Sequence, residues 1–440
     1  MSTSEATRVV DDPARARVIL WPLGVTLLLA LGMGVFLSVG AESMQAFARF
    51  SFAKQVTLPA VYLAFLVALL ASPTRLRPSR PFWWYALAGT VFLSLLASVI
   101  YPRQQVGLLS LAEGLALPVG FLLVSEISFR ARPWSFVRVR KLFGLVAPVV
   151  GISLALGSSL TPYNGIAIPI GFVLVYLAIQ RAFEGWPRFL ALAGGGAIVV
   201  GEVGRLWSDP DASLAVVAQV GVCTFLIVLG LLPRSLRVLA ATTGTLVGLV
   251  YVVNSGYWRL VVGDVEEDWD VTLLHRSYET SAVREAVSHP VSMIFGLGPA
   301  ATVDLSSSPD ASTLIASGRD INAVDDVHIL TSWLLLKFGL LGILWGAVML
   351  VHLARVVLRI LRHDHGASAN FGFAVLAVAV VALAFSAATN LFTNPFFAIG
   401  VGSIALANST QSRSGMYRHS SYRRLPARSL SQDRDVRSSG

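Results

Sequence analysis

Apolar runs separated by short polar connectors make up most of this chain. A helix needs about 20 mostly apolar residues to cross the ~30 Å hydrocarbon core of a bilayer, and most of the runs approach or exceed that length. The pattern predicts an all-α, polytopic membrane helix bundle of about 12 spans. The runs cover residues 18–39, 58–71, 82–100, 106–124, 142–160, 166–179, 189–203, 214–232, 238–253, 329–352, 371–388 and 396–407.

Some of the runs, among them 58–71, 189–203 and 396–407, are shorter than 18 residues. A hydrophobic stretch that does not match the bilayer thickness changes its tilt or thins the bilayer around it. We therefore expect these three runs to be tilted, to sit in thinned bilayer or to be re-entrant.

The composition supports the same class of protein. Hydrophobic residues make up 55% of the chain and charged residues 13%, with a mean hydropathy of +0.69, whereas soluble domains carry roughly 25% charged residues. A chain of 440 residues holds such a bundle and one loop domain, so several domains are not expected. The one cysteine, Cys223, excludes an intrachain disulfide.

Lysine and arginine are distributed unevenly among the connectors. With the N-terminus placed inside and the sides alternating, 25 of the 34 basic residues fall inside, eight outside, and Lys337 within a run. Cytoplasmic loops of membrane proteins carry such an excess of basic residues. The distribution predicts two cytoplasmic termini, and it accounts for the net charge of +9 without a nucleic-acid partner.

These predictions divide the chain into five regions. The first run spans about 22 residues, against about 7 to 15 for the apolar part of a signal peptide, so it is predicted to be a retained anchor. The serine- and arginine-rich end of the chain is predicted to be disordered, and it is either a solvated tail that only fixes the topology or a tail whose arginines lie on anionic membrane lipids. The regions are a cytoplasmic tail (1–17), a bundle of about nine spans (18–253), an extracytoplasmic loop (254–328), about three further spans (329–408) and a basic cytoplasmic tail (409–440).

Ionisable residues are rare inside the predicted spans. Only Glu113 and Lys337 lie well inside one, with Glu202 near an outer end. Ion-coupled transport usually uses more carboxylates at midplane depth, so this scarcity argues against a secondary transporter. Lys337 is the ninth residue of its run, about 13 Å deep at 1.5 Å per residue. It is expected to pair with Glu113, to extend its ammonium toward the headgroups or to contact an anionic substrate.

The loop 254–328 is the longest polar stretch of the chain, with 12 of the 25 acidic residues and three of the seven histidines. Its acidic beginning, 263–270, is interpreted as a solvated connector, because no histidine or cysteine there supports a metal site. Apolar residues recur at helical spacing over 276–289 and Pro290 follows, which predicts an amphipathic helix on the outer surface of the membrane. The serine-rich stretch 303–317 is expected to be a mobile flap.

Two arginines of this predicted helix are candidate anion-binding groups. Arg276 and Arg284 are eight residues apart, so they lie about 12 Å apart along the helix and roughly 80° around it. Both would reach one ligand only if that ligand were large and anionic.

The end of the loop carries candidate turn and proton-transfer groups. Gly296 and Gly298 form a Gly-x-Gly sequence, which either lets the backbone approach a ligand closely or makes a turn. His328 directly precedes the tenth run, with Asp325 and Asp326 just upstream. A histidine in this position is suited to acid–base catalysis, or it is an interfacial residue that hydrogen-bonds the loop.

These motifs resemble those of the O-antigen ligase and polymerase-like family of bacterial envelope glycosyltransferases. In that family a large extracytoplasmic loop late in the chain carries an arginine-led helix, then a proline and then a Gly-x-Gly turn. Arg276, Pro290 and the Gly296–Gly298 pair correspond to these features.

The resemblance continues into the tenth run. In the family a histidine opens the next span and glycines follow eleven and fourteen positions later, as do His328, Gly339 and Gly342 here. The chain departs from the pattern at three positions, where the family has Asn or Ser, Leu and an acidic residue: Ile329, Ser332 and Lys337.

The resemblance implies a GT-C-like bundle in a bacterial cytoplasmic membrane and a transfer reaction at its outer face. The donor would be a polyprenyl-pyrophosphate-linked oligosaccharide, and the acceptor a hydroxyl of another glycan or of an envelope lipid. No cofactor, metal or nucleotide sugar is implied.

The same resemblance assigns roles to the candidate residues. Arg276, Arg284 and Lys337 would hold the pyrophosphate, because negative charge develops on the departing phosphates. His328 would take the proton of the acceptor hydroxyl, oriented by Asp325 or Asp326.

Two other classes of protein remain open from the sequence. One is a membrane transporter or a flippase for lipid-linked glycans. The other is a non-catalytic scaffold for envelope assembly, in which the loop binds a partner protein.

Overall fold

The described part of the chain is all-helical. The computed structural model describes residues 82–100, 167–181, 185–208, 213–254, 271–308 and 329–362, with shorter pieces at 63, 66–67, 70, 80, 111, 114–115, 118–119, 122–123, 126, 183, 258–259, 311–312, 321–324 and 327. Among these residues every named element is a helix, and the one extended pairing is an isolated antiparallel bridge between Val303 and Val324. The all-α class is confirmed for these residues.

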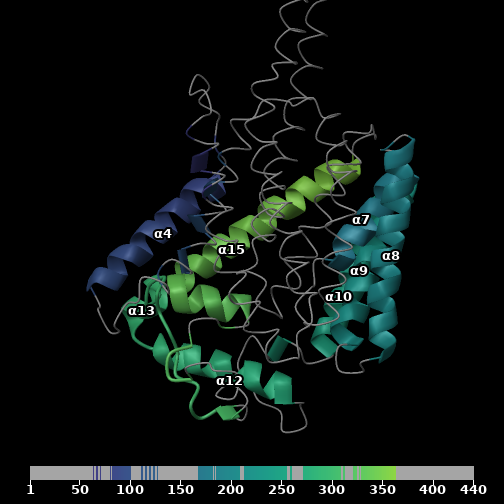
Figure 1. Cartoon of the computed structure of the whole chain (residues 1–440). Coiled ribbons are helices and arrows are strands. Elements are labelled where there is room, and N and C mark those ends of the chain that lie inside the picture. Colours follow the sequence, from purple (N-terminus) through teal and green to yellow (C-terminus); the bar gives the residue numbers. More distant parts are fainter. Residues whose placement is uncertain are drawn as a thin grey trace, which may run out of the picture.

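Six long helices coincide with six of the predicted apolar runs (Figure 1). The helix α4 begins and ends where its run does, and the others differ from theirs by a few residues at most ends. The 189–203 run lies within a helix of 23 residues, so its prediction as a short span is wrong. The helices are α4 (Phe82–Ile100), α7 (Ala167–Ile179), α8 (Trp186–Ser208), α9 (Ser213–Leu231), α10 (Arg234–Asn254) and α15 (Leu330–Arg362).

The remaining six runs and both predicted tails lie wholly or mostly outside the described residues. Within the described ranges, two helical stretches are long and apolar enough to cross a membrane, Phe82–Val99 and Leu330–Met349, and three shorter apolar stretches occur in α8, α9 and α10. The count of about 12 spans therefore stays a prediction.

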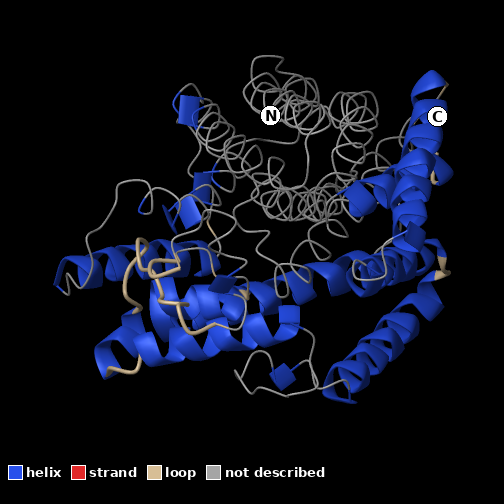
Figure 2. Cartoon of the chain, turned by 60° about the horizontal axis from the view of Figure 1, so that its bottom comes forward, coloured by secondary structure: helices blue, strands red, loops and turns tan. Residues whose placement is uncertain are grey.

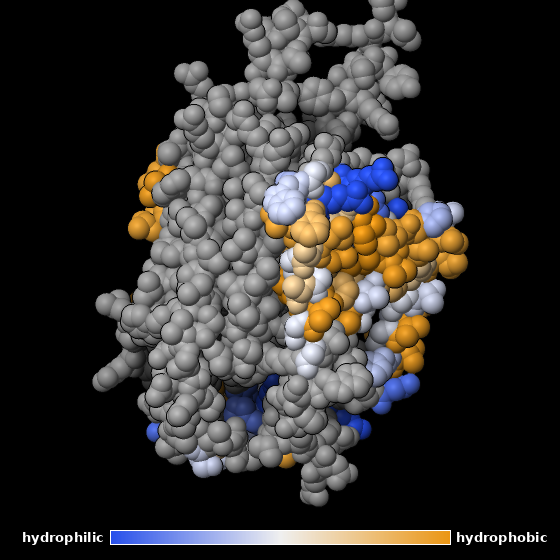
Figure 3. Space-filling view, turned by 45° about the vertical axis from the view of Figure 1, so that its right-hand side comes forward, coloured by the Kyte–Doolittle hydropathy of each residue, from blue (hydrophilic) through white to orange (hydrophobic). Residues whose placement is uncertain are grey.

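The helices α7 to α10 pack together as one group, and α15 contacts α4, α10 and the loop helices α12 (Val271–Ala286) and α13 (Pro290–Phe295). Large apolar side chains remain exposed along α10, including Leu239, Val247 and Val253. Figure 3 shows a broad apolar band on this side of the molecule, bordered by strongly hydrophilic surface. Exposed apolar bands of this extent are typical of surfaces that face lipid or a partner.

The helix α15 is broken at Gly339. This glycine has φ 63° and ψ −157°, a conformation that interrupts a helix and that glycine tolerates best. Figure 1 shows two helical pieces that meet at an angle beside α13. The predicted run 329–352 is therefore not one straight helix. The depth of about 13 Å for Lys337 was calculated for a straight helix, so it no longer applies.

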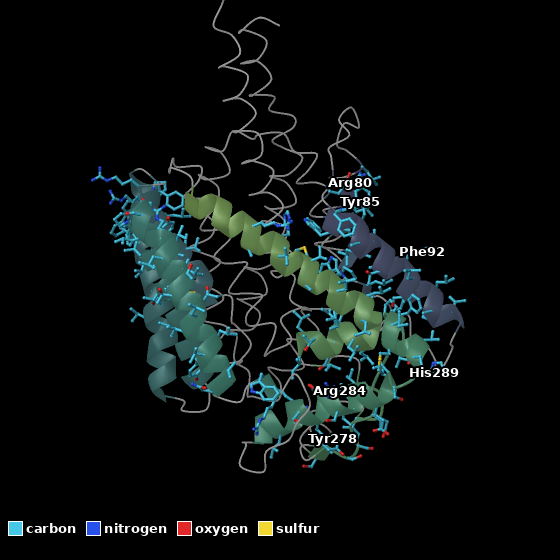
Figure 4. The ribbon with its side chains drawn as sticks, turned by 180° about the vertical axis from the view of Figure 1, so that it is seen from behind. Arg80, Tyr85, Phe92, Tyr278, Arg284 and His289 are labelled. Atoms are coloured by element: carbon cyan, nitrogen blue, oxygen red, sulfur yellow. The ribbon has the colours of Figure 1, made fainter. Side chains whose placement is uncertain are left out.

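An ion pair fixes the end of α4 that lies away from the loop. The Nε and Nη2 atoms of Arg80 each donate to a different carboxylate oxygen of Glu126 at 2.7 Å, and the guanidinium lies 4.7 Å from the centre of the Trp84 ring. The hydrogen bonds to Glu126 hold the pKa of Arg80 above its ordinary value. Figure 4 shows Arg80 at one end of α4, with Tyr85 and Phe92 further along it and His289 near the opposite end.

Replacement of Arg80 by Met should lower the free energy of unfolding by about 2 kcal/mol, because it removes the charged donor of two hydrogen bonds to a buried carboxylate. The Glu126 side chain is only 6% exposed. The matched control is Arg355→Met, at an exposed position on α15, which should change stability by less than about 0.5 kcal/mol. Thermal unfolding in detergent measures both, and equal losses would contradict a structural role of this pair.

Candidate functional site

The candidate site is built on α12, which begins at Val271, five residues earlier than predicted, and ends at Ala286. Its apolar stripe is confirmed, since Val283 and Val287 are buried. Ser277 falls on the polar side of the predicted amphipathic pattern, yet it is fully buried. The helix packs against α15, so it is not simply a helix resting on a membrane surface.

A turn separates α12 from α13. Pro290 begins α13 at its first turn, where a missing N–H costs no hydrogen bond, so this proline opens a helix as well as following one. His289 caps α13, and its Nδ1 accepts a hydrogen bond from the Val291 N–H at 3.3 Å. The helix predicted over 276–289 therefore combined the end of α12 with the residue that caps α13.

A buried polar cluster lies between α12 and the rest of the loop. The Nδ1 of His275 lies 2.8 Å from Ser308 Oγ, and its Nε2 lies 3.1 Å from Glu279 Oε1. The contact to Glu279 is short enough for an ion pair but not aligned as a hydrogen bond. Both side chains are at most 7% exposed, and buried polar groups of this kind hold one arrangement only when they are paired.

A second polar contact joins α12 to the start of α15. The hydroxyls of Thr280 and Ser332 lie 3.0 Å apart, and both residues are buried. Ser332 is one of the positions where this chain departs from the resembled family. In the structure this serine pairs with α12, so the departure has a local partner within the chain.

The two arginines lie on α12 as predicted. Arg276 is half-buried and its carbonyl accepts from Thr280 Oγ1, whereas Arg284 is exposed in the last turn of the helix. Figure 4 shows Arg284 on α12 near the middle of the loop region and His289 toward α4. Both arginines make interactions within the protein, so an anionic ligand would compete with those contacts.

The glycines of the loop and of α15 meet at one joint. Gly296 has φ 75°, and a Cβ atom at this position would come 2.5 Å from the carbonyl carbon of Lys337. Leu297 donates its N–H to the carbonyl of Leu336 at 2.8 Å. Gly298, at φ 102°, packs against Ser98 of α4. The Gly-x-Gly sequence is therefore a turn that docks onto α4 and α15, the second of its two predicted uses.

Gly339 belongs to the same joint, and Gly342 follows it in α15. A Cβ atom at Gly339 would come 2.5 Å from the carbonyl carbon of Ile294 in α13, and one at Gly342 would come 2.7 Å from Phe338 Cβ. Gly339 therefore allows the close approach of α13, whereas Gly342 allows a close contact within α15 itself.

Lys337 is buried at this joint, with an exposed fraction of 1%. Its Nζ donates to the carbonyl of Ala301 at 2.6 Å, and its own carbonyl accepts from Ser94 Oγ of α4. Of the three fates expected from the sequence, the pairing with Glu113 lies outside the described residues. The contact that the structure provides, to a backbone carbonyl of the loop, was not among them.

The segment after the glycine turn folds back onto the loop. Val303 and Leu305 are buried, and Val303 exchanges two backbone hydrogen bonds with Val324. Asp304 accepts a hydrogen bond from the Ser306 N–H, which lowers the pKa of this carboxyl, so the turn is weakened as the pH falls through that lowered pKa. Residues 301–308 thus form a packed strap, which belongs to the tan loop segments of Figure 2, and residues 303–308 are not the start of a free flap.

The predicted proton-transfer residues His328, Asp325 and Asp326 lie outside the described residues, as does Glu113. Their flanking residues Val327 and Ile329 are buried. The acidic connector 263–270 also lies outside the described residues. Within the ranges that the structure describes, no group of three or more metal-ligating side chains occurs.

Sequence reasoning missed the cluster of His275, Glu279 and Ser308. His275 and Glu279 are four residues apart, the spacing that places two side chains on one helix face, and this signal was available in the sequence. The contact to Ser308 was not, since it joins positions 33 residues apart across an irregular segment.

No protein family, no curated protein and no solved structure matches the chain.

Proposed function

We propose that the protein is an integral membrane glycosyltransferase that transfers or polymerises a polyprenyl-pyrophosphate-linked glycan onto an acceptor hydroxyl. The observation that carries this proposal is the glycine joint. Gly296 and Gly298 in the loop, and Gly339 and Gly342 in α15, belong to two separate parts of the resembled motif. Gly339 lies against Gly296, Gly298 lies against Ser98 of α4, and Gly342 follows Gly339 in α15, which supports reading the two parts of the motif as one site.

The arginines of α12 fit the chemistry of a pyrophosphate leaving group. Guanidinium groups donate bidentate hydrogen bonds to phosphate oxygens and stabilise charge that develops as a bond breaks. Arg276 and Arg284 lie on a helix that contacts the first part of α15 through Thr280 and Ser332. This helix is held by a buried polar cluster, and a rigid support is what precise placement of charge requires.

His328 is assigned the role of accepting the proton of the acceptor hydroxyl, and Asp325 or Asp326 would orient its imidazole. A neutral imidazole has an ordinary pKa near 6.5 and accepts a proton at neutral pH. His328 lies four residues before Ser332, the residue that contacts α12. The assignment rests on the resemblance and on this position in the sequence.

The proposal places the chain in a bacterial cytoplasmic membrane as a GT-C-like bundle of about 12 spans with both termini inside. The apolar helices and the exposed apolar side chains along α10 support this placement. The loop helices α12 and α13 then lie at the outer face, where lipid-linked glycans are presented. The reaction as proposed needs no cofactor or metal.

The test uses purified protein in liposomes with a synthetic polyprenyl-pyrophosphate-linked oligosaccharide and a glycan acceptor. Wild-type protein should lengthen the acceptor and release polyprenyl pyrophosphate. Alanine at Arg276, Arg284 or His328 should reduce the rate at least about 100-fold while the protein remains in the membrane. The matched control is Arg259→Ala, since this arginine belongs to the same loop but lies outside α12 and beside Trp258.

Other outcomes separate the rival classes. Full activity in all three variants would reject the site. Movement of lipid-linked glycan or solute without product, driven by an ion gradient, would indicate a flippase or transporter. Cross-links from the loop to a protein, with none to glycan, would indicate an assembly scaffold.

A further inference from the structure

The break in α15 exposes carbonyl groups that an unbroken helix would use internally. In a helix, the carbonyls of Leu336 and Lys337 accept from N–H groups four residues later. Gly339 interrupts that ladder. The Leu336 carbonyl accepts from Leu297 of the loop and the Lys337 carbonyl accepts from Ser94 of α4. The break is therefore completed by bonds from two other parts of the chain.

The Lys337 side chain adds a bond in the opposite direction. Its ammonium leaves the same residue of α15 and donates to the Ala301 carbonyl at 2.6 Å. Burying an ammonium at 1% exposure is costly, and this desolvation offsets part of what its hydrogen bond contributes to stability. We therefore look for the role of Lys337 in the position that it gives to Ala301, and not in the stability of the whole protein.

Ala301 is the start of the strap, residues 301–308. Its N–H bonds to the Gly298 carbonyl at 3.0 Å, which closes the glycine turn. From there the strap continues to Ser308, which contacts His275 on α12. A bond at Ala301 therefore sets the position of a segment whose far end reaches the helix that carries both arginines.

We propose that Lys337 is a positioning residue that fastens the strap 301–308, through the Ala301 carbonyl, to the break in α15. In this role the ammonium is used within the protein and is not a ligand of the substrate. The effect on glycan transfer rests on the function proposed above, whereas the fastening of the strap does not depend on it.

The experiment measures the fastening directly. In a Cys223→Ser background, which removes the one native cysteine, a reporter is placed at Val303→Cys, a position with 3% exposure in the strap. The rate of maleimide labelling in liposomes is compared between Lys337 and Lys337→Met. Loss of a hydrogen bond from a charged donor should raise the labelling rate about tenfold or more.

Two controls distinguish local release from loss of fold. A second reporter, Val283→Cys, lies on the buried face of α12 outside the strap and should keep its labelling rate. Leu340→Met, at an exposed position next to the break, should leave both reporters unchanged. Lys337→Gln, a shorter side chain that keeps an N–H donor, should show a smaller rise than Lys337→Met at Val303→Cys.

A rise at Val303→Cys alone, with an unchanged melting temperature, supports the proposal. No rise overturns it, and so does an equal rise at both reporters, because the lysine then supports the whole fold. If Lys337→Met does not accumulate, the same comparison with Lys337→Gln decides. Where transfer activity is measurable, a higher KM with unchanged labelling would make Lys337 a substrate ligand and would also overturn the proposal.

Discussion

Replacement of Gly339 by Ala should prevent the loop from docking on α15 and should lower the free energy of unfolding by at least about 4 kcal/mol. Two causes add. The conformation at φ 63° and ψ −157° is nearly exclusive to glycine and costs about 1 to 3 kcal/mol for any other residue. The new Cβ would also lie 2.5 Å from the carbonyl carbon of Ile294, and backbone atoms in packed helices cannot move aside easily.

The same helix supplies a control substitution that should not destabilise the protein. Gly346 is helical, and a Cβ atom there would meet Leu334 Cδ1 at 3.5 Å, an ordinary contact. Gly346→Ala should therefore be neutral or stabilise the protein by up to about 1 kcal/mol, because alanine favours a helix over glycine. Thermal unfolding and the yield of folded protein in detergent measure both variants. A harmless Gly339→Ala would mean that the break in α15 is not required.

Replacement of Glu279 by Ala should give the second largest loss, about 3 kcal/mol. Glu279 is fully buried and lies 3.1 Å from the imidazole of His275, which also contacts Ser308. Removing the carboxylate leaves the Nε2 side of a buried imidazole without this partner. The amides of α12 should exchange faster with solvent near both of its polar contacts, and the glycan transfer proposed above should fall as well.

Glu285→Ala is the matched control, because Glu285 lies on the exposed side of the same helix and its loss should matter by less than about 0.5 kcal/mol. Hydrogen exchange of the α12 amides reports the local effect, and thermal unfolding reports the global one. If the two variants behave alike, the buried cluster does not hold the helix.

The helices themselves could be predicted from hydrophobicity alone. Runs of about 20 apolar residues have few alternatives to a helix when backbone groups must be bonded internally, and α4, α7 and α9 begin and end within one residue of their predicted runs. The break in α15 could not be predicted in this way. Phe, Gly and Leu at positions 338 to 340 fit a continuous apolar helix, and only the packing of α13 against α15 explains the positive φ of this glycine.

The candidate site could be predicted from the sequence in part. The arginines of α12 and the glycine turn were recognised by type and order along the chain. The buried face of α12 was misjudged, because Ser277, Glu279 and Thr280 are polar and a pattern of polar residues normally predicts an exposed face. Their burial depends on partners from distant segments, Ser308 and Ser332 among them, and such pairings cannot be read from one helix.

The joint at Gly339 also has a consequence for how the chain is made. Ser94 precedes Lys337 by 243 residues, and synthesis at about 5 to 20 residues per second separates them by roughly 12 to 50 seconds. During that interval α4 has no α15 to contact, and the glycine turn, once it is made, has only the α4 side of its docking surface. We expect the loop to assemble late, after the tenth apolar run has left the ribosome, and a chain that stops before this run to be an early target of proteases at the membrane.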